Sequence, residues 1–163
     1  MHYKLVKIVE LSGNKASVYS LFSETEKCTL FEKFMRENSI TFKSEIIDVL
    51  KRLKSIASKE GAREHYFKTR EGKPGDLVCA LYDRPNSQLR LYCIRLGGSL
   101  IILGGGGHKP KTIRALQSNP KLSFENSLMV RLSDELLQRL RNKEILYVND
   151  YMDLEGDLDF KFR

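Results

Sequence analysis

Two neighbouring segments of the chain carry the residues with the clearest potential for chemistry on a phosphodiester. The first is the strand-like run LRLYCIRL, in which Arg90 and Tyr92 are two residues apart and share one face of a strand. An arginine can hold a phosphate through paired hydrogen bonds while a neighbouring tyrosine contacts a ribose or a base. Arg95 falls on the opposite face unless a β-bulge intervenes. We therefore predict that Arg90 belongs to the site.

The second segment is a run of four glycines, residues 104–107, followed by His108, Lys109 and Lys111. We predict that the glycines form a loop between a strand and a helix N-terminus, where backbone N–H groups favour an anion. A histidine exchanges protons near neutral pH, and the lysines supply mobile positive charge. With Arg90, these residues could hold a phosphodiester and stabilise the charge that develops during its cleavage.

Ordinary structural explanations exist for each part of this constellation. A glycine cluster is more often a plain loop than a phosphate cradle, and a single loop histidine is more often structural than catalytic. The run matches neither a Walker loop nor a dinucleotide-binding fingerprint. The three histidines, His2, His65 and His108, show no metal-ligand spacing with the three cysteines, so we expect no metal and no cofactor. The conjunction of the residues, rather than any one of them, indicates a site.

Positive charge is concentrated in residues 61–122. These residues have a net charge of +7, whereas residues 1–23, 24–60 and 123–163 have +2, +1 and −3. Such a block predicts a polyanionic partner, most simply RNA or DNA, although an accidental cluster on a soluble basic protein is the alternative. Besides the catalytic candidates, the residues predicted to contact RNA are Arg84, Tyr92, Arg95, Thr112 and Arg114.

The length of 163 residues predicts a single domain with an adequate core. The three cysteines, Cys28, Cys79 and Cys93, are odd in number and widely spaced, which favours buried thiols in a reducing compartment over a disulfide framework. No apolar run is long enough to span a membrane, and the N-terminus lacks a signal-peptide pattern. We therefore expect a cytoplasmic protein with no membrane partner.

The pattern of residues predicts an α+β domain in four parts: an N-terminal hairpin (1–22), two helices (23–61), a basic antiparallel meander with its loop (62–118), and a C-terminal helix with an acidic tail (119–163). Ser23 and Glu26 form a capping-box pattern for the first helix, and Gly61 is a stop signal for the second. A short helix is predicted over 110–117, ended by Asn119 and Pro120, and another over 133–143 with Ser133 as N-cap. The tail is predicted to be an edge strand or a docking segment.

The segment LRLYCIRLGGSLIILGGGGHKPKT resembles the RelE/ParE toxin superfamily, particularly its HigB-like and phage-derived branch. Arg90 stands at the family's strand arginine, residues 100–103 at its apolar strand, and Lys109, Lys111 and Thr112 in its basic loop. His108 stands where an aromatic residue or a histidine often precedes the lysines. The resemblance covers about residues 42–118.

This resemblance implies a small antiparallel sheet packed against two helices. It also implies a metal-independent endoribonuclease that cleaves messenger RNA on the ribosome and is inhibited by a cognate antitoxin, often a helix-turn-helix protein. The extra N-terminal hairpin, the long C-terminal segment and the missing second strand arginine depart from the family pattern. Two alternatives stay open: a non-catalytic protein of the same fold that binds a protein or nucleic acid, and a small phosphate- or nucleotide-binding protein that uses the glycine run.

Overall fold

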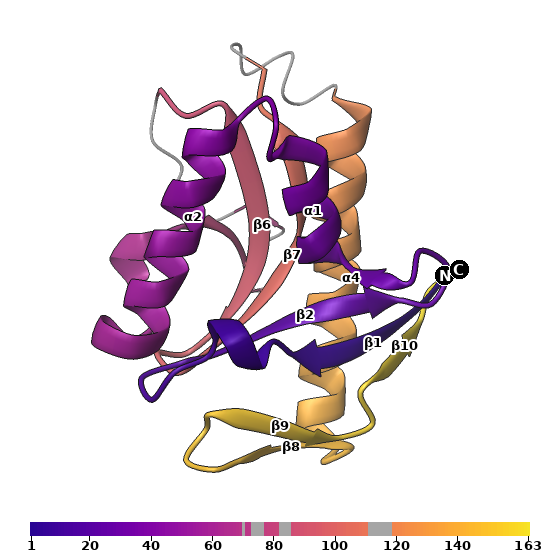
Figure 1. The fold of residues 1–163 in the computed structure, drawn as a ribbon. Coiled ribbons are helices and arrows are strands. Elements are labelled where there is room, and N and C mark those ends of the chain that lie inside the picture. Colours follow the sequence, from indigo (N-terminus) through magenta and orange to yellow (C-terminus); the bar gives the residue numbers. More distant parts are fainter. Residues whose placement is uncertain (70, 73–76, 82–85, 111–118) are drawn as a thin grey trace.

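The computed structural model describes residues 1–69, 71–72, 77–81, 86–110 and 119–163, and most of its strands form one eight-stranded sheet (Figure 1). The order in this sheet is β10-β1-β2-β7-β6-β5-β4, and β3 pairs with the end of β2. The pair β2 and β7 is parallel and the other pairs are antiparallel. The strands are β1 (His2–Lys7), β2 (Ser17–Ser23), β3 (Cys28–Thr29), β4 (Phe67–Lys68), β5 (Val78–Leu81), β6 (Leu89–Leu96), β7 (Leu100–His108) and β10 (Asp159–Lys161).

Both predicted antiparallel units are present in this sheet. β1 and β2 form the N-terminal hairpin, whose connection contains a short 3-10 helix, Val9–Leu11. β5, β6 and β7 form the meander, because their links are too short for a parallel crossover. A second 3-10 turn, Glu64–Tyr66, directly precedes β4, which is only two residues long. The parallel pair of β2 and β7 makes the hairpin an integral part of the sheet.

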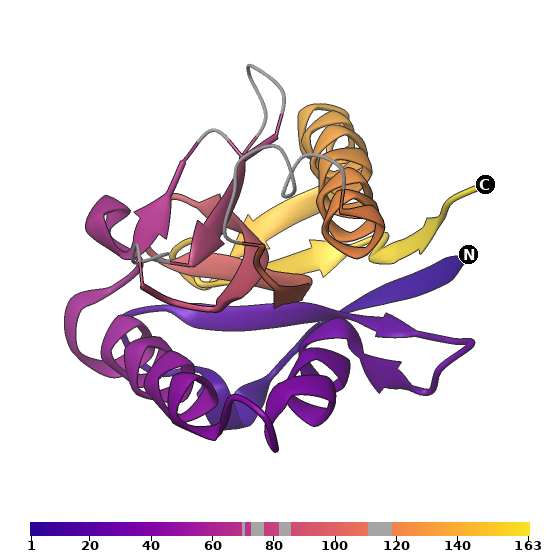
Figure 2. The same ribbon diagram turned by 90° about the horizontal axis from the view of Figure 1, so that it is seen from above.

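Two helices, α1 (Leu30–Asn38) and α2 (Lys43–Ser55), cover one face of the sheet (Figures 1 and 2). Their buried side chains pack against inward-facing residues of β2, β6 and β7. α2 continues into a π-helical turn, Ile56–Glu60, and Gly61 ends it with a φ of 82°, as predicted. The buried face of α2 forms part of the core on this side of the sheet.

The predicted start of the first helix is wrong by about two turns. Ser23 is the last residue of β2, where it pairs with Tyr3 on β1, and its hydroxyl accepts a hydrogen bond from the backbone of Glu26 within a turn. A second capping box, Thr29 with Glu32, begins α1 instead, and the Thr29 hydroxyl accepts from the Glu32 N–H at 3.1 Å. Strand pairing outweighs the local capping preference at Ser23.

A third helix, α4 (Pro120–Arg141), covers the opposite face of the sheet (Figure 2). Asn119 caps this helix by accepting from the Leu122 N–H at 2.9 Å, and Pro120 is its first residue. The short helix predicted over 110–117 lies, apart from Pro110, outside the described residues. Ser133 is not an N-cap but a buried mid-helix residue, whose hydroxyl accepts from the Leu77 N–H. Among the described residues, no helix joins the length and apolarity that crossing a bilayer requires.

The glycine run lies inside β7 and is not a loop. The strand continues to His108, and a register shift opposite Leu91 and Cys93 places an extra residue on β7. A side chain at Gly104 would begin 2.5 Å from the Met129 sulfur of α4, and one at Gly105 would overlap the Glu125 carboxylate. The glycines therefore let a helix approach the sheet closely, and they do not form the predicted phosphate-binding loop at a helix N-terminus.

The C-terminal segment returns to the sheet edge beside the N-terminus (Figure 1). A separate hairpin, β8 (Ile145–Val148) with β9 (Asp153–Gly156), precedes β10. Strand β10 pairs with β1 at the sheet edge, which is the first of the two alternatives predicted for the tail. The acidic side chains of this segment contact Lys7, His2 and Arg139, all of which lie outside the basic block of residues 61–122.

Candidate functional site

Arg90 lies in the interior between β6 and α4. Its side chain shares the α4-facing side of β6 with Tyr92, and only 4% of it is exposed. Its Nη1 atom is 3.0 Å from Oε2 of Glu71, so the guanidinium is held in a buried ion pair. The predicted alternation along the strand is correct, but it directs Arg90 toward the core. A guanidinium in this position is neutralised by a carboxylate rather than presented to a phosphate.

A compact polar cluster surrounds this ion pair. The Asn126 side-chain amide donates to the Glu71 carbonyl, and Lys68 is 3.8 Å from the second Glu71 carboxylate oxygen. Burial raises the pKa of the Tyr92 hydroxyl, although the hydrogen bond and the charge of Arg90 oppose this effect. Buried charges are tolerated where partners are this close, and this cluster joins β6 to α4 and to the segment around Glu71.

His108 and Lys109 lie on the other side of the sheet. His108 pairs with Leu89 in the ladder, and its exposed ring stacks on Phe42, with ring centroids 5.4 Å apart and an angle of 14° between the planes. The Lys109 ammonium is 3.3 Å from the Ser87 hydroxyl. Since neighbouring residues of a strand point to opposite faces, Gly107 pairs with Arg90 while His108 faces α2. The structure therefore does not bring Arg90 and His108 together, contrary to the predicted grouping.

The remaining residues that were predicted to bind RNA fall into two groups, one within the described residues and one outside them. Arg95 is half-buried and donates through Nε to the Ala62 carbonyl at 2.6 Å, whereas Tyr92 is buried and so is not exposed to RNA. Lys111, Thr112, Arg114 and Arg84 lie outside the residues that the structure describes.

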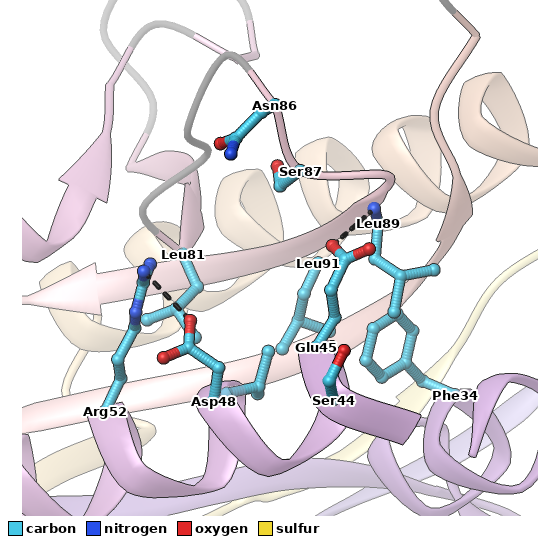
Figure 3. Close-up of a pocket in the computed structure, with 11 residues that line it drawn as sticks. Phe34, Ser44, Glu45, Asp48, Arg52, Leu81, Asn86, Ser87, Leu89 and Leu91 are labelled. Atoms are coloured by element: carbon cyan, nitrogen blue, oxygen red, sulfur yellow. Dashed lines mark hydrogen bonds and ion pairs between the residues drawn. The ribbon is translucent and has the colours of Figure 1, made fainter. Parts of the chain in front are cut away.

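A cavity of about 320 Å³ lies beside His108 and Lys109, between α2 and the strands β5 and β6 (Figure 3). Its apolar wall consists of Phe34, Val49, Leu81, Leu89 and Leu91, and its polar residues are Ser44, Glu45, Asp48, Arg52, Asn86 and Ser87. Sequence reasoning missed this cavity. The available signal was the spacing of Ser44, Asp48 and Arg52, which places them on one helix face.

Hydrogen bonds and an ion pair hold the polar side of this cavity in place. Glu45 accepts hydrogen bonds from the backbone N–H groups of Gln88 and Leu89 at 2.9 and 3.1 Å, which fixes the start of β6 against α2. Asp48 and Arg52 form an ion pair of 2.9 Å one turn further along the helix (Figure 3). The cavity therefore has a fixed apolar wall facing a row of charged groups.

Glu125 is the second unusual polar residue that sequence reasoning missed. It is 4% exposed and lines a smaller cavity of about 170 Å³ near the N-terminus, and its Oε2 atom has no hydrogen-bond partner among the described residues. Burial raises the pKa of this carboxyl, with Lys121 and Lys33 opposing the shift. Lys121 is 3.8 Å from the other carboxylate oxygen, too far for a hydrogen bond.

The raised pKa of Glu125 predicts how stability depends on pH. The folded carboxyl keeps its proton to a higher pH than the unfolded one, so the free energy of unfolding falls as pH rises through this interval. We expect Glu125→Gln to remove this fall and to raise the free energy of unfolding at pH 8 by about 1 kcal/mol or more, with little effect at pH 3. Urea unfolding at both pH values tests this, with Glu37→Gln as the control, because exposed Glu37 contacts the same Lys121. Equal pH dependence in the wild type and Glu125→Gln would contradict the prediction.

The cysteines form no disulfide in this structure. Cys79 and Cys93 face each other on β5 and β6 with their sulfur atoms 3.3 Å apart, and both are buried, as predicted. Burial raises the pKa of the Cys93 thiol, which keeps it in its unreactive protonated form. Within the described part of the chain, no three His, Cys, Asp or Glu side chains converge as metal ligands would.

Compared with known proteins, the chain matches no family model, no curated protein and no solved structure.

Proposed function

We propose that this protein binds RNA at the end of β7 and acts in the cytoplasm as the toxin of a toxin–antitoxin pair, cleaving messenger RNA on the ribosome. The observation that carries the proposal is the exposed His108, stacked on Phe42 and followed directly by Lys109, in the most basic part of the chain. A planar stack beside a cation suits a nucleotide, since a base can extend the stack while its phosphate contacts the lysine.

The order of the elements also supports this proposal. Strand β2 is followed by the helices α1 and α2 and then by the antiparallel strands β5, β6 and β7. This order agrees with the two helices and small antiparallel sheet that the RelE-like, HigB-like resemblance implies. The added hairpin strand β1, the edge strand β10 and the covering helix α4 would then be extensions of a RelE-like centre.

The proposed chemistry uses the ribose 2′-OH as the nucleophile. His108 accepts the 2′-OH proton as the oxygen attacks the adjacent phosphorus, and the bond from phosphorus to the 5′-oxygen breaks. The products are a 2′,3′-cyclic phosphate and a 5′-hydroxyl, whose proton comes from a second acid or from water. Lys109 stabilises the charge on the phosphoryl oxygens, and Lys111 remains a predicted second cation for this role. We expect a helix-turn-helix antitoxin to inhibit the reaction.

Cleavage during translation in a purified ribosome system tests this proposal. We expect wild-type protein to cut messenger RNA and His108→Ala to reduce the cleavage rate by roughly 100-fold or more, as for a lost general base. The double variant Lys109→Ala/Lys111→Ala should lose both cleavage and growth arrest. Lys4→Ala is the control, since Lys4 is an exposed lysine on β1, outside the basic block. Unreduced cleavage by the double variant would refute this site.

The burial of Arg90 favours a second candidate, a non-catalytic RNA-binding protein. Because Glu71 holds this arginine, its charge is not offered to a scissile phosphate at His108. The same assay separates the two candidates. Wild-type protein that binds ribosomal complexes with a strong salt dependence, yet leaves the messenger intact, would establish binding without cleavage.

A further inference from the structure

We propose that the cavity between α2 and β6 binds a single nucleobase that carries an exocyclic amino group, with guanine as the preferred base. This inference rests on the proposed RNA binding. It states which base of the RNA the cavity beside His108 and Lys109 would recognise. The cavity volume of about 320 Å³ lies at the small end of the roughly 300–1,000 Å³ usual for ligand pockets, which suits one base.

The apolar wall of the cavity is rigid and suited to a flat ring. Leu81, Leu89 and Leu91 belong to the sheet, Phe34 comes from α1, and all four are buried in the core beneath α2. The mouth of the cavity lies among its exposed lining residues, which are Ser44 and Asp48 on α2 and Asn86 before β6. A base could thus insert its apolar faces along a preformed wall while its polar edge stays near the helix.

The polar side of the cavity is rich in acceptors that match amino and imino groups. Glu45 and Asp48 are acceptors when ionised, and the Asn86 amide and Ser87 hydroxyl can both donate and accept. Guanine presents two neighbouring donors, N1–H and the N2 amino group, which a carboxylate can accept. Uracil presents a single N–H between two carbonyl oxygens, which carboxylates repel. The acceptors therefore favour guanine over uracil.

The net charge of the cavity indicates that the phosphate of a bound nucleotide lies outside it. The two carboxylates and the guanidinium of Arg52 give the cavity a formal charge of −1, which disfavours an anion within it. Lys109, by contrast, contacts Ser87 at the cavity wall and follows the stacked His108. A nucleotide with its base inside would thus extend its phosphate toward Lys109. The cavity and the proposed cleavage site would then contact consecutive parts of one RNA strand.

Titration of the purified full-length protein with GMP and with UMP, followed by amide NMR shifts, tests this inference. We expect GMP to shift residues on α2 and at the start of β6, and to bind at least about tenfold more tightly than UMP. Ser44→Trp should weaken GMP binding at least tenfold, because an indole at this exposed position would cover the mouth. Lys51→Trp is the matched control, since Lys51 is exposed on the same helix but does not line the cavity. Asp48→Asn should reduce the preference for GMP over UMP.

The outcomes separate this inference from the proposed function. Equal binding of GMP and UMP, no binding of either, or GMP binding that Ser44→Trp leaves unchanged would overturn the base-binding cavity. RNA cleavage that persists in Ser44→Trp with the same base preference would overturn the cavity while the nuclease proposal stands. Selective GMP binding by a protein that neither binds nor cuts RNA would support the cavity and refute the RNA function. Unchanged melting temperatures of the variants show that each comparison is made on folded protein.

Discussion

Gly106→Ala is expected to lower the free energy of unfolding by about 3 kcal/mol or more, enough to unfold much of a marginally stable domain. A Cβ atom at this position would overlap the backbone carbonyl of Arg90 on the neighbouring strand. A flexible side chain could rotate away from such a contact, but a backbone carbonyl within a ladder can move only if the pairing of β6 and β7 changes. The measurement is chemical denaturation of the purified variant.

Gly98→Ala provides the matched control for this substitution. Gly98 lies in the turn between β6 and β7, and a Cβ atom there would meet no atom within 4 Å. We expect its free energy of unfolding to stay within about 0.5 kcal/mol of the wild type. If Gly106→Ala were as stable as Gly98→Ala, the close approach of the two strands would not be a real constraint on the glycine run.

Arg90→Met is expected to destabilise the protein by about 3–5 kcal/mol, because it leaves the Glu71 carboxylate buried without its main cationic partner. Lys68, at 3.8 Å, is half-exposed and compensates only weakly. Removing both charges in Arg90→Met/Glu71→Leu should restore most of the lost stability, since neither charge is then left unpaired. Thermal and urea unfolding of the single and double variants measure this coupling.

The double variant also tests the role of Arg90 in the proposed reaction. Because Arg90 and His108 lie on opposite faces of the sheet, we expect the folded double variant to keep the RNA cleavage rate of the wild type. Arg141→Met, at an exposed position on α4, controls for the loss of one positive charge from the protein. If the folded double variant bound RNA but no longer cleaved it, Arg90 would have to be part of the catalytic site.

The two corrections at the glycine run and at Arg90 share one cause. Glycines followed by a histidine and lysines predict a loop when the segment is considered by itself. Helix α4 begins at Pro120, thirteen residues after the last of these glycines, and packs so closely on β7 that Gly104 and Gly105 are required as strand residues. In the same way, an arginine on a strand is available to a ligand only if nothing covers that face, and α4 covers it.

The sequence by itself determined the α+β class, the N-terminal hairpin, the antiparallel meander and the end of α2 at Gly61. These follow from local periodicity and turn chemistry, which act over a few residues. Only the tertiary structure decided which face of the sheet each helix covers, and thereby that Arg90 pairs with Glu71 while His108 stacks on Phe42. The same packing formed the cavity beside α2 and buried Glu125. These features depend on contacts between residues far apart in the chain, which neighbouring residues in the sequence do not encode.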